Sequence, residues 1–155
     1  MTDVAALIRF NEGDKRFVYD DATGKPIVPG SVVKGHPTIG NGFALDVAGL
    51  DDIEIAFILG RRIALAAGRA AADLGPGAWI GLDVVRQAAL VDMAYEMGGG
   101  GLAGFPTMLA AVRARDWQKA HDAALDSDWA RKEAPVRAGR DATILLTGLW
   151  PAEIG

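Results

Sequence analysis

The sequence contains no cysteine among its 155 residues. Without thiols the protein can form neither disulfides nor thiolate metal sites, so its fold does not depend on an oxidising compartment. It also lacks a membrane-length apolar run and the basic and apolar segments of a signal peptide at its start. We therefore expect a chain that folds in water, resides in the cytoplasm and does not insert stably into a membrane.

Positive charge is scarce as well. Lysine and arginine together number 16 against 20 aspartates and glutamates, which gives a formal net charge of −4. Because phosphate neutralisation needs a basic face, this balance argues against a nucleic-acid partner. The two histidines, His36 and His121, have no partners at metal-ligand spacing, so the sequence predicts no metal site.

The first part of the chain predicts one helix followed by strands. Thr2 is suited to cap this helix and Gly13 to end it, which places Glu12 at its C-terminus. From Phe17 to Phe43 the sequence is rich in Gly, Pro, Thr and Val, a composition typical of hairpin strands and loops. This is the only segment for which we predict β structure.

The rest of the chain predicts helices. Asp51 and Glu54 have the spacing of a capping box, and an apolar helical run continues from them to about Asp73. Leu74–Gly81 is predicted to break the chain, and the glycines of 98–101 should end a buried helix. The residues expected to begin later helices are Asp83, Pro106, Asp116, Ser127 and Pro135, and Gly148 is placed to end the last one.

The order of several motifs resembles a known family. Asn11-Glu12-Gly13, Tyr19-Asp20-Asp21 and Thr38-Ile39-Gly40-Asn41-Gly42 occur in the order found in bacteriophage lysozymes of the T-even type, a glycoside hydrolase family of phage endolysins. The resemblance spans nearly the whole chain and is weakest over 44–84. It continues through 88–98, 101–105, Trp117, Ser127, Trp129, 137–140 and 147–150.

This resemblance implies a lysozyme-like α+β fold that is mostly helical. The chain would form a single domain, 1–155, with a small N-terminal β-hairpin lobe at about 13–52. A connecting helix at 53–73 would join it to a helical lobe made of 1–12 and 74–155. The substrate cleft would lie between the lobes.

The resemblance further implies a muramidase that hydrolyses the β-1,4 bond between N-acetylmuramic acid and N-acetylglucosamine in peptidoglycan, with no cofactor. Glu12 would be the general acid, since the negative end of the helix dipole disfavours a carboxylate there. Asp21 would be the second carboxylate and Thr38 would help to hold the attacking water. An inverting displacement of this kind places the two carboxyl groups roughly 6.5–9.5 Å apart.

Further residues receive roles through the same resemblance. Arg137 matches the arginine that orients the acid, and Tyr95 is a candidate for sugar contact, with a place in the core as the alternative. Asp20, the neighbour of Asp21, is expected to be a solvated turn residue. Trp117, Trp129 and Trp150 are expected to pack the helical lobe.

Two features depart from the family pattern. The segment 22–37 is longer than the usual tight turn, and its prolines and glycines suit an elongated hairpin or loop that extends the cleft wall. Asn41 stands where the family commonly has an aromatic or aliphatic residue. Phe43 stands where the family commonly has histidine or arginine, and it cannot form that residue's ion pair.

Two other functions stay open at the level of sequence. The chain could be a catalytically silent peptidoglycan-binding protein, or a lytic transglycosylase that uses Glu12 alone. We expect a monomer of phage or prophage origin that stays in the host bacterial cytoplasm until lysis. A holin would then give it access to the cell wall in the periplasm.

Overall fold

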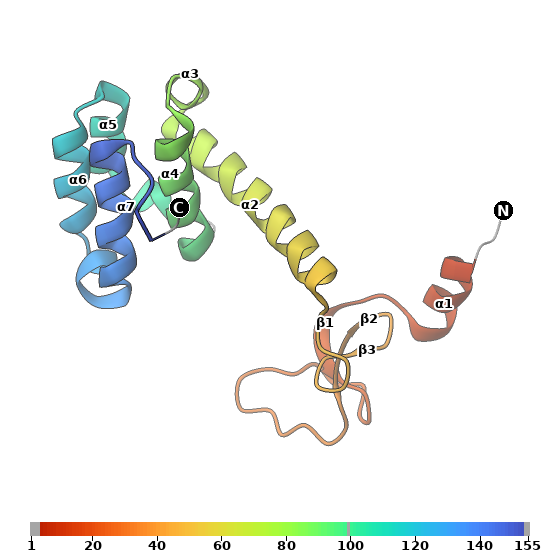
Figure 1. The fold of residues 1–155 in the computed structure, drawn as a ribbon. Coiled ribbons are helices and arrows are strands. Elements are labelled where there is room, and N and C mark those ends of the chain that lie inside the picture. Colours follow the sequence, from red (N-terminus) through yellow and green to blue (C-terminus); the bar gives the residue numbers. More distant parts are fainter. Residues whose placement is uncertain (1–3, 99, 154–155) are drawn as a thin grey trace. The chain divides into compact units, whose positions relative to one another are not determined.

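The computed structural model describes residues 4–98 and 100–153. Helices dominate, and one small three-stranded antiparallel sheet accompanies them, so the predicted α+β, mostly helical class is confirmed (Figure 1). Residues 1–56 and 57–155 form two compact units, which are described separately. The elements are α1 (Val4–Glu12), β1 (Lys15–Asp20), β2 (Pro37–Gly40), β3 (Phe43–Ala44), α2 (Asp52–Leu74), α3 (Pro76–Ile80), α4 (Val84–Met97), η1 (Leu102–Gly104), α5 (Pro106–Ala114), α6 (Trp117–Leu125), η2 (Trp129–Glu133) and α7 (Pro135–Thr147).

Helix α1 ends where the sequence predicts. Glu12 is its last residue, and Gly13 follows with φ 77°, a left-handed conformation that glycine adopts without strain. The Gly13 N–H donates to the Arg9 carbonyl at 2.9 Å and closes the helix. Thr2, the predicted cap, lies outside the described residues. The assignment of 1–12 to the helical lobe stays a prediction.

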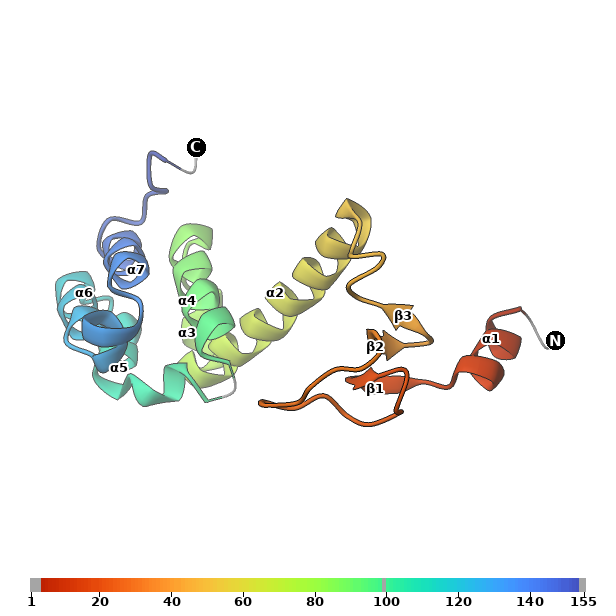
Figure 2. The ribbon, with the colours of Figure 1, turned by 90° about the horizontal axis from the view of Figure 1, so that it is seen from below.

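The sheet covers the predicted β segment, but β1 begins before it, at Lys15, and β3 ends after it, at Ala44. Its strand order is β1-β2-β3, with both pairs antiparallel (Figure 2). Tyr19 of β1 lies opposite Thr38 of β2, which in turn lies opposite Ala44 of β3. Tyr19 also bridges to Pro26, so the loop after β1 folds back along the strand.

Helix α2 begins with the predicted capping box. The Asp51 N–H donates to Glu54 Oε2 at 3.0 Å, and the Glu54 N–H donates to Asp51 Oδ1 at 2.7 Å. The helix ends at Leu74, close to the predicted end. No helix within the described ranges is both long and apolar enough to span a membrane.

The second unit is built around helix α4. This helix buries Leu90 and Met93, and Asp83 caps it by accepting from the Arg86 N–H at 2.9 Å. Helix α7 packs against α4 and α6, and α5 packs against α6. The predicted starts of the later helices are confirmed at Pro106, Asp116, Ser127 and Pro135, and Gly148 ends α7 with φ 67°.

The structure differs from the sequence-based expectation at two places in this unit. The predicted break at Leu74–Gly81 contains the short helix α3, because Pro76 suits the first helical position, where no N–H is needed. Trp129 is buried and meets Phe105 edge to face at 6.1 Å, as a packing role requires. Trp150, however, is 54% exposed, because it follows the end of α7.

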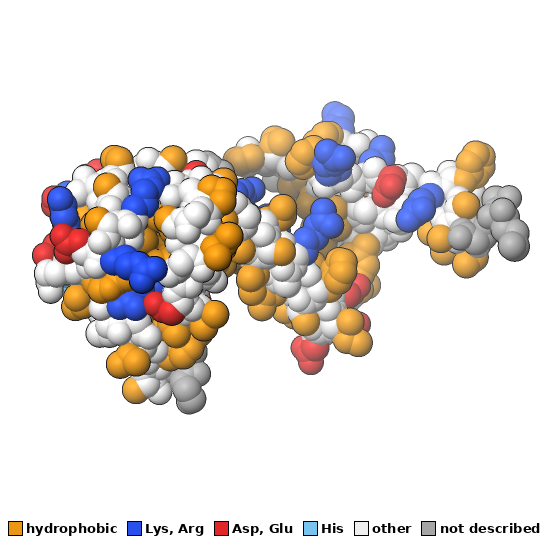
Figure 3. All heavy atoms as spheres, turned by 90° about the horizontal axis from the view of Figure 1, so that it is seen from above, with side chains coloured by type: hydrophobic (Ala, Val, Ile, Leu, Met, Phe, Trp, Pro, Cys, Tyr) orange, Lys and Arg blue, Asp and Glu red, His pale blue; other side chains and the backbone are white. Residues whose placement is uncertain are grey.

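Many large apolar side chains remain at the surface. Figure 3 shows hydrophobic side chains scattered over the visible face, among lysine, arginine and acidic groups. The large apolar side chains of α1 and of the first turns of α2 are exposed. The exposed set includes Val4, Leu7, Phe10, Ile53 and Phe57.

Candidate active site

The predicted acid, Glu12, lies beside the turn between β2 and β3. A Cβ built on Gly42 would come 2.7 Å from Glu12 Oε2, so a side chain at this position would push the carboxylate of Glu12 aside. Gly42 also has φ 80°, a conformation that side-chain-bearing residues rarely adopt. Gly42, the second glycine of the Thr-Ile-Gly-Asn-Gly motif, is therefore in close contact with the carboxylate of Glu12.

Asn41 fixes the same turn to the end of α1. Its side-chain amide donates to the Gly13 carbonyl and lies 3.5 Å from Asp14 Oδ1. This contact joins the residues directly after Glu12 to the turn that holds Gly42. Asn41, a departure from the family pattern, thus has a structural role that the sequence alone did not reveal.

Asp21 is fixed by the peptide groups on either side of His36. The Asp21 N–H donates to the His36 carbonyl at 3.1 Å, and the His36 N–H donates to Asp21 Oδ1 at 2.6 Å. These bonds close the base of the 22–35 loop. The length of this loop therefore does not separate Asp21 from β2.

Thr38 lies on the same face of the ladder as Asp21. Tyr19 is opposite Thr38, and Asp21, the residue after β1, hydrogen-bonds to the backbone of His36, so Asp21 and Thr38 are diagonal neighbours at the end of the ladder. The Thr38 hydroxyl donates to the His36 carbonyl at 3.1 Å. Since its hydrogen is used, this hydroxyl can act toward another partner only as an acceptor. The residue is 3% exposed.

Asp20 is not the solvated turn residue expected from the sequence. It is 4% exposed, because the loop after β1 wraps around its carboxylate. Hydrogen bonds from this loop to the carboxylate, led by the one from the Lys34 N–H, lower the pKa of Asp20. The donors are the N–H groups of Ala22 (3.1 Å), Lys34 (3.0 Å) and Gly35 (2.9 Å) and the Thr23 hydroxyl (3.0 Å).

The side chain of His36 adds an ionic contact at the same place. Its Nδ1 lies 3.1 Å from Asp46 Oδ2. The hydrogen bond and the charge of Asp46, together with the charge of Asp21, raise the pKa of His36. The exposed imidazole therefore favours its charged form next to the second proposed carboxylate.

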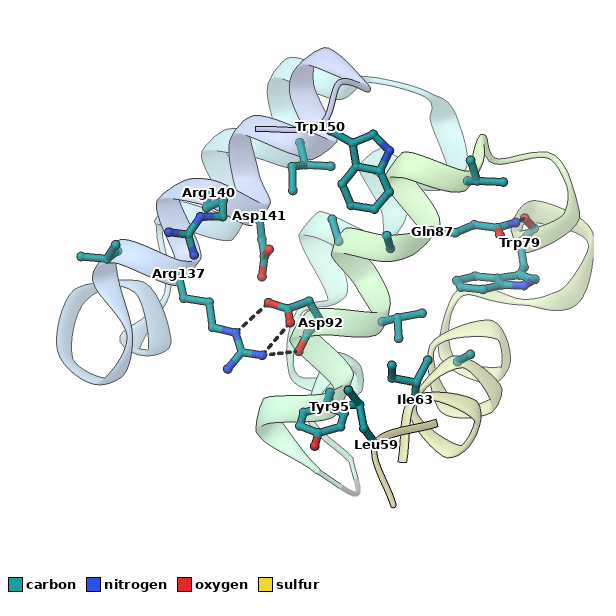
Figure 4. A pocket seen from close by; sticks show the side chains of 17 residues that line it. Leu59, Ile63, Trp79, Gln87, Asp92, Tyr95, Arg137, Arg140, Asp141 and Trp150 are labelled. Carbon is teal, nitrogen blue, oxygen red and sulfur yellow. Dashed lines mark hydrogen bonds and ion pairs between the residues drawn. The ribbon is translucent and has the colours of Figure 1, made fainter. Parts of the chain in front are cut away.

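In the second unit, Arg137 is held by two acids of α4. Its Nε and Nη2 donate to the two carboxylate oxygens of Asp92 at 2.7 and 2.6 Å, and its Nη1 lies 2.9 Å from Glu96 Oε2 (Figure 4). This two-point contact, led by the hydrogen bonds from Asp92, raises the pKa of Arg137. Sequence reasoning missed both acids, although their spacing of four residues puts them on one face of α4.

Arg137 and Asp92 line a pocket of about 900 Å³ within this unit. Tyr95 is 41% exposed and lies in the same wall, so its alternative place in the core was wrong. Asp141 of α7 also lines the pocket, and Figure 4 shows its side chain pointing toward Asp92. Sequence reasoning missed Asp141 because an aspartate on a helix is usually exposed.

The structure thus brings together part of the predicted set. Glu12, Asp21 and Thr38 belong to the first unit, and the backbone N–H and carbonyl of His36 bind Asp21 and Thr38, respectively. Arg137 and Tyr95 belong to the second unit, and the catalytic roles of all five stay predictions. Within residues 4–98 and 100–153, no group of three or more His, Cys, Asp or Glu side chains could hold a metal ion.

Comparisons with known proteins show a partial similarity to a phage protein. No family model matches the chain. The pre-baseplate central spike protein Gp5 of Enterobacteria phage T4 is 47% identical over 75 residues, which are 48% of this chain and 13% of that protein. The chain therefore matches only a small part of this relative's length. The similarity points to a phage origin and not to a lysozyme family.

Proposed function

We propose that this chain is a phage muramidase that hydrolyses the β-1,4 bond between N-acetylmuramic acid and N-acetylglucosamine. The observation that carries the proposal is a pair of hydrogen bonds at the His36 backbone, whose N–H donates to Asp21 and whose carbonyl accepts from the Thr38 hydroxyl. They support one carboxylate and one hydroxyl acceptor on the same face of the ladder. The same compact unit contains Glu12 at a helix end. A phage origin is compatible with a wall-degrading activity.

The proposed reaction uses these groups in an inverting displacement. Glu12 donates its proton to the leaving glycosidic oxygen, and Asp21 accepts a proton from the water that attacks the opposite face of the sugar. Asp21 Oδ1 already accepts from the His36 N–H, so Oδ2 is the oxygen for the water. The second O–H of the water would donate a hydrogen bond to the Thr38 hydroxyl oxygen. A lone pair of the water then faces the anomeric carbon.

Two residues of the second unit complete the proposal. Arg137 would be the residue that orients the acid, and Asp92 and Glu96 fix the position of its guanidinium group. Tyr95 would contact a sugar ring, for which its exposed aromatic side chain is suited. The place of Tyr95 in the pocket wall is compatible with its role.

The similarity to a central spike protein favours a second biological setting. Instead of a free endolysin released through a holin, the same activity would belong to a spike protein of the phage particle. Mass spectrometry of purified particles and of the particle-free lysate distinguishes these settings. Peptides of this chain in the particles indicate the spike setting, whereas peptides in the lysate alone indicate the endolysin.

The activity is tested with Glu12→Gln. Wild type should clear chloroform-permeabilised Gram-negative cells and release reducing sugar from purified sacculi, whereas Glu12→Gln should do neither while its circular dichroism stays native. Equal lysis by both proteins would remove Glu12 from the mechanism. A wall-binding protein would pellet with sacculi without releasing sugar. A lytic transglycosylase would yield anhydromuramic ends in the muropeptide mass spectrum and would tolerate Asp21→Ala.

A further inference from the structure

Two carboxyl groups face each other inside the pocket of the second unit, and no proposed catalytic step uses either of them. Asp92 of α4 and Asp141 of α7 point toward one another (Figure 4). Asp141 is 2% exposed, and Asp92 is half-buried and held by Arg137. Burial together with the neighbouring carboxylate of Asp92 disfavours ionisation of Asp141.

The unpaired oxygen of Asp141 indicates which group carries the proton. Its Oδ2 is buried and has no hydrogen-bond partner among the described residues. An ionised carboxylate in this position would leave a charged oxygen unpaired, whereas a neutral carboxyl group can donate its O–H to Asp92. Burial, and then the charge and hydrogen bond of Asp92, raise the pKa of Asp141 to about 8. The protonated form therefore prevails at neutral pH.

The other groups around Asp141 only partly oppose the rise in its pKa. Arg137 and Arg140, both of α7, favour its ionised form, but less strongly than burial and Asp92 oppose it. Glu96 of α4 pairs with Arg137, and Tyr95 of α4 adds a phenol to the pocket wall. Helix α6 and the η2 turn also pack on α7, and no charged group of theirs is among those acting on Asp141.

We propose that Asp92 and Asp141 form a carboxyl pair that shares one proton, and that Asp141 is a positioning residue that holds Arg137 through Asp92. Asp141 lies one helical turn beyond Arg137 on α7, and Asp92 faces both side chains. When the proton leaves to water or buffer, the pair gains one negative charge and its carboxylates repel. The ionised carboxylate of Asp141 then becomes a second acceptor for Arg137 on the same helix, and Arg137 loses its two-point contact with Asp92.

The proton and the position of Arg137 are measured without any assay of activity. Carboxyl ¹³C and arginine ¹⁵Nε resonances of the full chain are followed between pH 5 and 10. Asp141 should titrate near pH 8, and the Arg137 Nε resonance should shift with the same midpoint. In Asp141→Asn both the carboxyl titration near pH 8 and the matching shift of the Arg137 Nε resonance should vanish, because the amide still donates to Asp92 and does not titrate. The exposed Asp128→Asn, whose partner is Lys132, should leave both steps unchanged.

The importance of the pair for catalysis rests on the proposed function and is tested separately. Wild-type kcat should fall to about half at pH 8 and about a tenth at pH 9, as one titrating group requires, and Asp141→Asn should move this decline to higher pH. Asp141→Leu, which cannot donate, should lower kcat at pH 6 while circular dichroism stays native. An Asp141 that titrates below pH 5, or an Arg137 resonance that ignores it, overturns the inference. Titration as expected without muramidase activity at any pH overturns the proposed function alone.

Discussion

The backbone N–H of His36 donates a hydrogen bond of 2.6 Å to Asp21 Oδ1. The carbonyl of the same residue accepts from the Asp21 N–H and from the Thr38 hydroxyl, each at 3.1 Å. The backbone of His36 thus fixes two side chains that are far apart in the sequence. Because Asp21 receives this bond on one oxygen only, its other oxygen can serve as a proton acceptor.

Asp21→Asn separates the hydrogen bond that positions the Asp21 side chain from its proposed role as a proton acceptor. The amide oxygen can still accept from the His36 N–H, so the loop base should stay closed and the melting temperature should change little. The amide cannot act as a base, so kcat should fall by about 10²–10⁴-fold. Rates of reducing-sugar release measure this loss. Asp52→Asn, an exposed acid in the same unit to which no catalytic role is assigned, is the control and should retain activity. A fully active Asp21→Asn would support the transglycosylase alternative.

Much of the fold was predictable because its signals are local. The end of α1 at Glu12 follows from Gly13, and the start of α2 follows from the pair Asp51 and Glu54. In each case the residues that decide the structure lie within four positions of one another. Helix caps act over that range, so the sequence reveals them directly.

The contacts of the candidate site could not be predicted in the same way. Asp20 is buried because donors at Lys34 and Gly35, 14 and 15 residues further along, fold back to it. The spacing of residues within a loop does not determine such a path. The bond between Arg137 and Asp92 joins positions 45 residues apart, and it depends on how α4 packs against α7.

Asp20→Asn should loosen the loop between β1 and β2. The carboxylate accepts from several backbone N–H groups, and an amide would direct its own N–H groups toward some of these donors. Amide hydrogen exchange should accelerate at Lys34 and Gly35, and Asp52→Asn, at an exposed helix position, should not change it. Since the pKa of Asp20 is lowered, its contribution to stability is present above the ordinary value of 3.8 and is lost as pH falls through the folded-state value. Unchanged exchange in Asp20→Asn would contradict this role.

Gly42→Ala should disturb the proposed acid directly. Alanine at φ 80° costs about 1–2 kcal/mol of backbone strain, and its Cβ would collide with Glu12 Oε2. Both the melting temperature and the rate of sacculus digestion should decrease. Gly24→Ala is the matched control, because Gly24 has φ 66° but open space around a Cβ. It should lose similar stability and keep its activity. Equal activities of the two variants would show that the position of Glu12 does not depend on Gly42.

His36 should titrate above its ordinary pKa of 6.5 because Asp46 stabilises the charged imidazole. For a raised pKa, the stabilising contribution is fully present below the unfolded-state value and is lost as pH rises through the folded-state value. Imidazole resonances followed by NMR should show the raised midpoint in wild type and a clear decrease in Asp46→Asn. Asp21→Asn should lower the midpoint less, since Asp21 acts only through its charge. A midpoint that Asp46→Asn leaves unchanged would contradict the assigned pair. Because the backbone of His36 binds Asp21 and Thr38, an Asp46→Asn protein that keeps full activity would show that backbone bonds alone position the two residues.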